Sequence, residues 1–95
     1  MKIHNTPTRD NFKDRGSLLP KWKEILGLDQ NTNYRCAIEG CPNIAEVGAH
    51  VRKVDPNDQK VHIAGTCQHH NKQPNDVEME LRSTSYLVPL TDFDK

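Results

Sequence analysis

The sequence CAIEGC at positions 36–41 and the sequence CQHHN at positions 67–71 enclose the stretch of chain that decides the fold. All three cysteines and four of the five histidines lie between these limits. Two close pairs of soft ligands about 25 residues apart are typical of a tetrahedral zinc site built from four Cys or His side chains. We predict that a structural zinc ion is bound by Cys36, Cys41, Cys67 and His70.

The local sequence favours this ligand set. A turn with a few intervening residues lets both side chains of a pair reach one ion, and Gly40 suits such a turn because glycine readily adopts a positive φ. Pro42 then ends the turn. In the second pair, two residues separate Cys67 from His70, whereas one separates it from His69. The spacing favours His70, and His69 remains an alternative ligand.

Two other interpretations of the cysteines stay open. The thiols could be small buried hydrophobic groups, or Cys36 and Cys41 could form a disulfide that leaves Cys67 over. The odd number of cysteines and the lack of an export signal argue against the disulfide.

Length and composition explain why a metal would matter. The 95 residues predict a single domain, 1–95, and only 34% of them are hydrophobic. Small domains with so thin a core usually depend on disulfides or a structural metal. We therefore expect a chain that folds only when it has bound zinc.

The charge is balanced, with 13 basic and 13 acidic residues, which argues against a non-specific coat on nucleic acid. The first 35 residues carry a net charge of +3 and are the better candidate for an anionic partner. No apolar run is long enough to span a membrane, and unpaired thiols suit a reducing compartment. We expect a cytoplasmic protein. We expect it to bind neither a membrane nor a small-molecule cofactor.

The first third of the chain predicts an arm and a helix. Residues 1–16 are polar, and we expect a flexible, extended arm. Residues 17–27 are expected to form a helix with Ser17 as N-cap, Gly27 as terminator and an apolar face that includes Trp22. Trp22 is interpreted as a hydrophobic plug over the zinc domain, with stacking on a base as the alternative.

Alternating hydrophobicity predicts strands in the remainder. Residues 47–54 and 60–64 are expected to form a β-hairpin around the turn at 55–58, between the two halves of the metal site. A short helix is expected after Asn71 and would be broken by Pro74. Residues 77–90 are expected to form a C-terminal β-hairpin, with Pro89 on an edge strand and a frayed tail beyond it.

This order of elements resembles the treble-clef zinc domains of the HNH (His-Me finger) endonucleases. The matching residues are the cysteine pair at 36–41, Ala49-His50-Val51 where the family reads Asp-His-Ile or His-His-Ile, and Cys67-x2-His70-Asn71 where it reads Cys-x2-Cys-Asn or Cys-x2-His-His. The resemblance covers residues 36–76. It implies an α+β fold, a small zinc-stabilised treble clef made of a zinc knuckle, a β-hairpin and a short helix.

The resemblance also implies roles for individual residues. In the family the strand histidine, here His50, is the general base, and a residue at the helix start, here Asn71, helps to hold a divalent ion such as Mg²⁺. His62 lies roughly where the family has its middle Asn. Ala49, however, replaces a metal-binding Asp or His, and an alanine cannot bind a metal.

Two functions follow from this comparison. The first is a zinc-binding, HNH-like module without hydrolytic activity, which binds nucleic acid or a protein partner. The alternative is an active metal-dependent endonuclease that cleaves phosphodiester bonds with His50 as base. Arg52, Lys53 and Lys72 are candidate contacts to phosphates, although a solvated surface also explains them. A buried structural role is an equal alternative for His50, and a plain helix-start hydrogen bond is one for Asn71.

Overall fold

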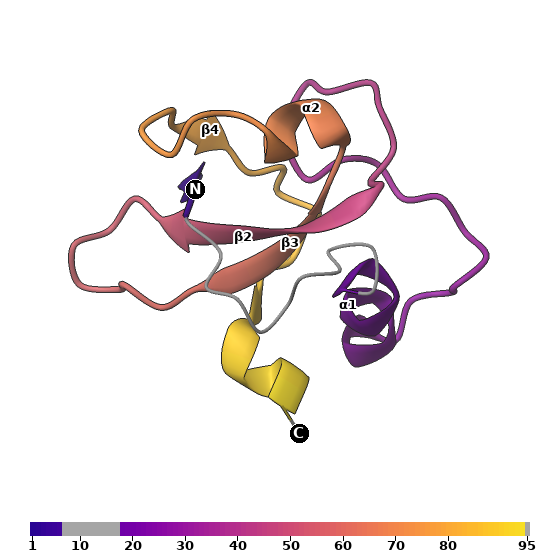
Figure 1. Ribbon diagram of the computed structural model, residues 1–95. Coiled ribbons are helices and arrows are strands. Elements are labelled where there is room, and N and C mark those ends of the chain that lie inside the picture. Colours follow the sequence, from indigo (N-terminus) through magenta and orange to yellow (C-terminus); the bar gives the residue numbers. More distant parts are fainter. Residues whose placement is uncertain (7–17, 95) are drawn as a thin grey trace.

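A five-stranded antiparallel sheet forms the centre of the chain in a computed structural model, which describes residues 1–6 and 18–94 (Figure 1). The strands are β1 (Lys2–Asn5), β2 (Val47–Lys53), β3 (His62–Thr66), β4 (Met79–Glu80) and β5 (Val88–Pro89). Their spatial order is β4-β1-β2-β3-β5. The described residues thus form an α+β fold around one sheet, as predicted.

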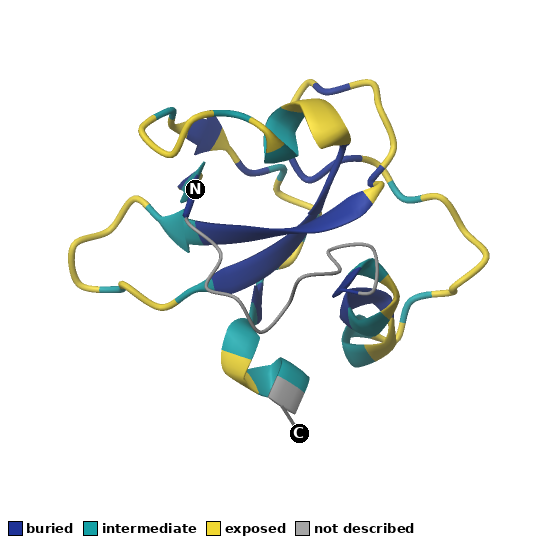
Figure 2. Cartoon of the chain, viewed as in Figure 1, coloured by how far each residue is buried: buried dark blue, intermediate teal, exposed yellow. Residues whose placement is uncertain are grey.

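The predicted hairpin is present as β2 and β3. Its register places Ala49 opposite Ala64 and His50 opposite Ile63. All five residues of β3 and the first five of β2 are buried, so both faces of the hairpin are covered (Figure 2). The turn begins at Asp55, which accepts hydrogen bonds from the backbone of Asn57 and Asp58. The long central hairpin is therefore the frame on which the other elements pack.

Helix α1 (Leu18–Leu26) covers one face of this hairpin. Leu18 and Trp22 are buried there against Ile63 and Val88, so Trp22 is a hydrophobic plug, as predicted. The approach is close, because a Cβ on Gly48 would lie 2.8 Å from Cβ of Leu18. The helix was expected over 17–27, and its predicted N-cap at 17 lies outside the described residues.

The opposite face of the sheet carries the cysteines. All three pack in one buried cluster with residues of β1, β2 and β4, and helix α2 (Gln68–Asn71) lies over this side. Figure 1 shows α1 and α2 on opposite sides of the sheet. The expected position of the short helix was wrong: it begins after Cys67, its N-cap, and ends at Asn71 instead of starting there.

The expectation of an arm over 1–16 was wrong for its first six residues. Residues 2–5 form β1, which lies between β2 and β4, and Ile3 is completely buried opposite Lys53 and Met79. The burial of Ile3 in the core accounts for the order of this polar segment. The remainder of the expected arm, 7–16, lies outside the described residues.

The predicted C-terminal hairpin over 77–90 was also wrong. β4 pairs with β1 and β5 pairs with β3, so the two segments lie on opposite edges of the sheet. Each short strand gains more by extending an existing sheet than two strands of two residues would gain from pairing with each other. Pro89 does occupy an edge strand, as expected.

The expected frayed tail contains a 3₁₀ helix, η2 (Leu90–Asp94), whose Phe93 packs against the cluster beneath α1. Within residues 1–6 and 18–94, no helix combines the length and the apolar character that crossing a membrane requires.

Candidate metal centre

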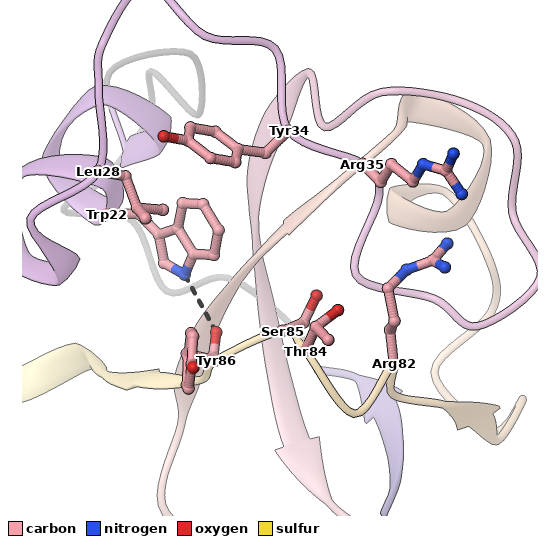
Figure 3. A pocket seen from close by; sticks show the side chains of 8 residues that line it. All are labelled: Trp22, Leu28, Tyr34, Arg35, Arg82, Thr84, Ser85 and Tyr86. Carbon is pink, nitrogen blue, oxygen red and sulfur yellow. Dashed lines mark hydrogen bonds between the residues drawn. The ribbon is translucent and has the colours of Figure 1, made fainter.

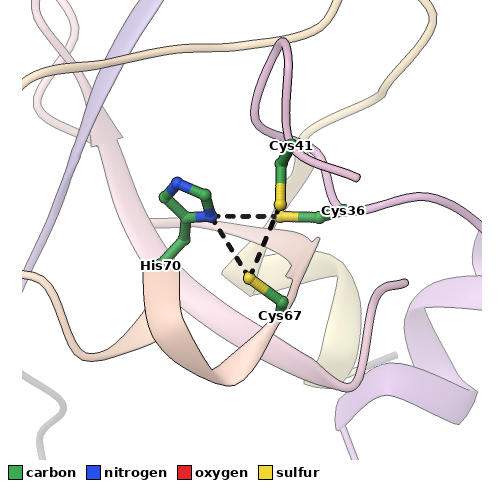
Figure 4. Close-up of side chains that lie close together, drawn as sticks. All are labelled: Cys36, Cys41, Cys67 and His70. Carbon is green, nitrogen blue, oxygen red and sulfur yellow. Dashed lines mark hydrogen bonds between the residues drawn. The ribbon is translucent and has the colours of Figure 1, made fainter. Parts of the chain in front are cut away.

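Four soft ligands converge beneath α2. The Sγ atoms of Cys36, Cys41 and Cys67 and a ring nitrogen of His70 all lie within 4.8 Å of one another (Figure 4). Sγ of Cys41 is 3.8 Å from Sγ of Cys67, and Nδ1 of His70 is 3.7 Å from Sγ of Cys36 and 3.2 Å from Sγ of Cys67. The structure therefore brings together the four residues that the sequence selects as ligands.

These separations fit a tetrahedral ion. Zn–S bonds of about 2.3 Å place two sulfurs about 3.8 Å apart, and a Zn–N bond of about 2.0 Å gives about 3.5 Å between sulfur and nitrogen. The observed S···S distance of 3.8 Å and the S···N distances of 3.7 and 3.2 Å are close to these values. The three thiols are buried, and His70 is partly buried. The group could hold a metal ion such as zinc.

Local structure positions the first pair. The backbone N–H of Cys41 donates to the carbonyl of Ile38, and Gly40 has the positive φ, 80°, that its place in the turn predicts. The N–H of Cys36 donates to the carbonyl of Asn43, and the N–H of Ala37 to that of Gly65 on β3. The ligand loop is thus attached to the central hairpin on the side of the second pair.

The second pair is positioned by the start of α2. Cys67 follows β3 directly and is the N-cap residue, whereas His70 lies inside the helix. His69 is exposed, lies with its ring edge-on to that of His70, and contacts Gln73 through Nε2. The geometry therefore selects His70 over His69, in agreement with the spacing.

The protonation of the ligands reflects their surroundings. Burial raises the pKa of the Cys36 thiol to about 12. Burial acts in the same direction on Cys67, but hydrogen bonds from the His70 backbone and from neighbouring thiols outweigh it and lower the pKa of Cys67. Burial, with the nearby His69, lowers the pKa of His70. A neutral imidazole and a ready thiolate are the forms that bind a metal.

Two residues outside the predicted site hold the ligand segments in place. Nε and Nη2 of Arg82 donate to the carbonyls of Cys36, Ile38 and Cys41 at 3.0–3.3 Å. Nδ2 of Asn5, which is 5% exposed, donates to three carbonyls at the end of α2, including that of His70. Neither role has a local sequence signal, because each contact joins segments more than 40 positions apart.

The structure does not bring together the three side chains that the HNH resemblance assigns to catalysis. His50 faces Ile63 across the sheet, whereas His62 faces Val51. Neighbouring strand residues point to opposite faces, so His50 lies on the α1 side and His62 on the side of the cysteines. Asn71 ends α2, and its carbonyl accepts a hydrogen bond from Asn5. Ala49, completely buried in the cysteine cluster, offers no ligand.

The three candidate phosphate contacts are also dispersed. Arg52 is partly buried on the same face as His50, and Lys53, its neighbour on β2, forms an ion pair of 3.1 Å with Asp58. Lys72 is exposed at the C-terminal end of α2. These residues do not form one basic patch.

Comparison with known proteins adds no identification. No family model matches the chain, and no curated protein or solved structure matches it either. The resemblance to HNH endonucleases therefore stays a prediction from the residues of the sequence.

Proposed function

We propose that this chain is a zinc-binding module of the treble-clef type, which binds a nucleic acid or a protein partner without hydrolysing it. Cys36, Cys41, Cys67 and His70 would hold the ion. Its role would be structural, because it would join the ligand loop to the start of α2 on one side of the central hairpin.

The closed ligand set carries this proposal. Structural zinc sites use four protein ligands, whereas catalytic sites keep one position open for water or substrate. Here four ligand atoms lie at tetrahedral separations, and three of them belong to buried side chains. Such a site stabilises a fold and leaves no coordination position for a reaction.

The order of elements supports a treble clef over residues 36–76. A turn carries the first ligand pair, β2 and β3 form the hairpin, and the second pair consists of Cys67, the N-cap of α2, and His70 within it. A treble clef with four protein ligands on one zinc ion would account for both the order of elements and the closed ligand set.

The zinc proposal is tested by metal analysis of the purified protein together with circular dichroism during chelation. We expect one zinc per chain, and loss of the folded signal when a strong chelator removes it. Cys41→Ser should reduce the zinc content, whereas Gln68→Ser, an exposed change beside a ligand, should retain it. A chain that stays folded and metal-free in excess zinc would contradict the proposal.

Hydrolysis receives less support as the second candidate. The general base that the resemblance implies, His50, points to the face opposite His62, and Ala49 takes the place of a metal ligand. A plasmid-nicking assay with zinc-loaded protein and added Mg²⁺, Mn²⁺ or Ni²⁺ is expected to show no cleavage. Cleavage that His50→Ala abolishes would establish the endonuclease instead.

A further inference from the structure

A hollow of about 300 Å³ lies beside the metal centre, between α1 and the segment that follows β4 (Figure 3). Three aromatic side chains, Trp22, Tyr34 and Tyr86, line it, and two arginines, Arg35 and Arg82, line it as well. Figure 3 shows Trp22 and Tyr34 at one end and both guanidinium groups at the other. The lining therefore combines an apolar aromatic part with a cationic part.

Hydrogen bonds fix the aromatic end in place. Nε1 of Trp22 donates to the carbonyl of Tyr86 at 3.3 Å, and the hydroxyl of Tyr34 accepts from the backbone N–H of Asp29 at 2.9 Å. Nζ of Lys23 lies 5.6 Å from the centroid of the Tyr34 ring. Tyr86 remains 60% exposed. Trp22 is only 4% exposed, so Tyr34 and Tyr86 supply the accessible ring surface. Tyr34 is held in place and loses little conformational entropy when a flat ligand packs against it.

The cationic end lacks a counterion among the residues that the structure describes. Arg82 uses Nε and Nη2 for backbone carbonyls, which do not neutralise its charge, and Arg35 is exposed. Neither arginine takes part in an ion pair with any carboxylate of residues 1–6 or 18–94. Two guanidinium groups at one end of a hollow favour a doubly charged oxyanion. Arg35 offers it paired hydrogen bonds, whereas Arg82, whose Nε and Nη2 are occupied, contributes Nη1 and its charge.

Hydroxyl groups lie between the two ends. Thr84 and Ser85 line the hollow, and Figure 3 shows both hydroxyls between the indole of Trp22 and the guanidinium of Arg82. From one end to the other, the lining offers aromatic rings, hydroxyls and guanidinium groups. A nucleotide has the complementary order of a flat base, a polar sugar and a phosphate.

From this arrangement we infer that the hollow is a binding site for one phosphorylated nucleotide unit. The base would pack against Tyr34 and Tyr86 beside the buried indole of Trp22, and the phosphate would lie at Arg35 and Arg82. The inference rests on the proposed function, because it specifies a nucleic-acid component as the partner of the zinc module. A balanced net charge suits recognition of one nucleotide better than a coat along a phosphate backbone.

The test is a titration of zinc-loaded protein followed by the fluorescence of Trp22, the one tryptophan of the chain. Adenosine monophosphate is expected to quench it with saturation. Adenosine should bind at least about tenfold more weakly, because it lacks the charged group. Inorganic phosphate should leave the fluorescence unchanged. Phosphate that binds as tightly as adenosine monophosphate would make the hollow a simple anion site and overturn the inference.

Two variants and a matched control assign the binding to the hollow. Arg35→Gln should weaken adenosine monophosphate by about tenfold, and Tyr86→Ala should weaken it too, since it removes a stacking surface. Lys60→Gln removes an exposed charge elsewhere and should have no effect. Binding that both hollow variants leave unchanged, or no binding at millimolar nucleotide, would overturn the inference.

Two further measurements separate the possible outcomes. A 5′-phosphorylated oligodeoxyadenylate that binds more tightly than the mononucleotide identifies a single strand as the source of the unit, and equal affinity identifies a free nucleotide. Zinc content is measured on the same samples. One zinc per chain without nucleotide binding overturns the inference and leaves the zinc module intact, whereas absence of zinc contradicts the module itself.

Discussion

The side-chain amide of Asn5 donates a hydrogen bond of 2.9 Å to the backbone carbonyl of His70, which lies 65 positions later in the chain. The same Nδ2 also reaches the carbonyls of Asn71 and Gln73. His70 and Asn71 are the last two residues of α2, where helix carbonyls lack intrahelical partners, and Gln73 follows the helix. The first strand of the sheet thereby fixes the helix that carries a metal ligand.

Replacing Asn5 should destabilise the zinc-loaded protein. Asn5→Ala removes the donor from three carbonyls, and we expect a loss of about 2 kcal/mol in the free energy of unfolding. Asn5→Asp should cost more, because it places a carboxylate against those carbonyls. Chemical denaturation checks both variants, with the exposed Lys2→Ala as control. Equal stability of Asn5→Asp and the wild type would contradict this account.

Arg82 should control zinc affinity without touching the ion. Loss of its bonds to the carbonyls of Cys36, Ile38 and Cys41 loosens the ligand loop, so Arg82→Met should weaken zinc binding by about 10–100-fold. Arg82→Lys keeps the charge but not the planar fork, and should give an intermediate value. Competition with a chromophoric chelator measures the affinities. An unchanged affinity in Arg82→Met would show that the loop holds its shape unaided.

The fourth ligand should tolerate a sulfur. His70 approaches the thiols through Nδ1, the ring nitrogen nearer the backbone, so a cysteine at this position reaches nearly as far. We expect His70→Cys to retain zinc and His70→Ala to lose affinity. His69→Ala should bind as the wild type does. Cobalt substitution reports the ligand set through its visible absorption, and a spectrum that changes in His69→Ala but not in His70→Ala would identify His69 as the ligand.

Zinc affinity should rise with pH. Burial raises the pKa of Cys36 to about 12, so the metal-free protein keeps this proton at neutral pH and must release it on binding. Each proton released makes the apparent affinity about tenfold stronger per pH unit. The lowered pKa of His70 leaves its imidazole neutral already at pH 7. Chelator competition between about pH 6 and pH 8 tests this dependence, and a constant affinity would contradict it.

The candidate site was more accessible to sequence reasoning than the complete sheet. Ligand pairs such as Cys67 and His70 are local, and β2 and β3 alternate clearly around a turn, so short-range rules identify them. β1 has only one buried apolar side chain, Ile3. The residues that pair with Ile3 in the sheet, Lys53 and Met79, lie about 50 and 76 positions away. Adjacency suggested that 77–90 would pair with itself. The pairing of these short strands with distant strands of the sheet depends on packing of the complete core, and no local sequence pattern reveals it.

The order of strands in the sheet has a consequence for synthesis. β1 leaves the ribosome before the other four strands, yet its neighbours are β2 and β4, so its second edge stays open until residues 79–80 have emerged. All four ligand residues are already available by then, since the last of them is His70. Metal capture can therefore precede closure of the sheet, and the nascent chain can take up its ion before β1 is held on both edges.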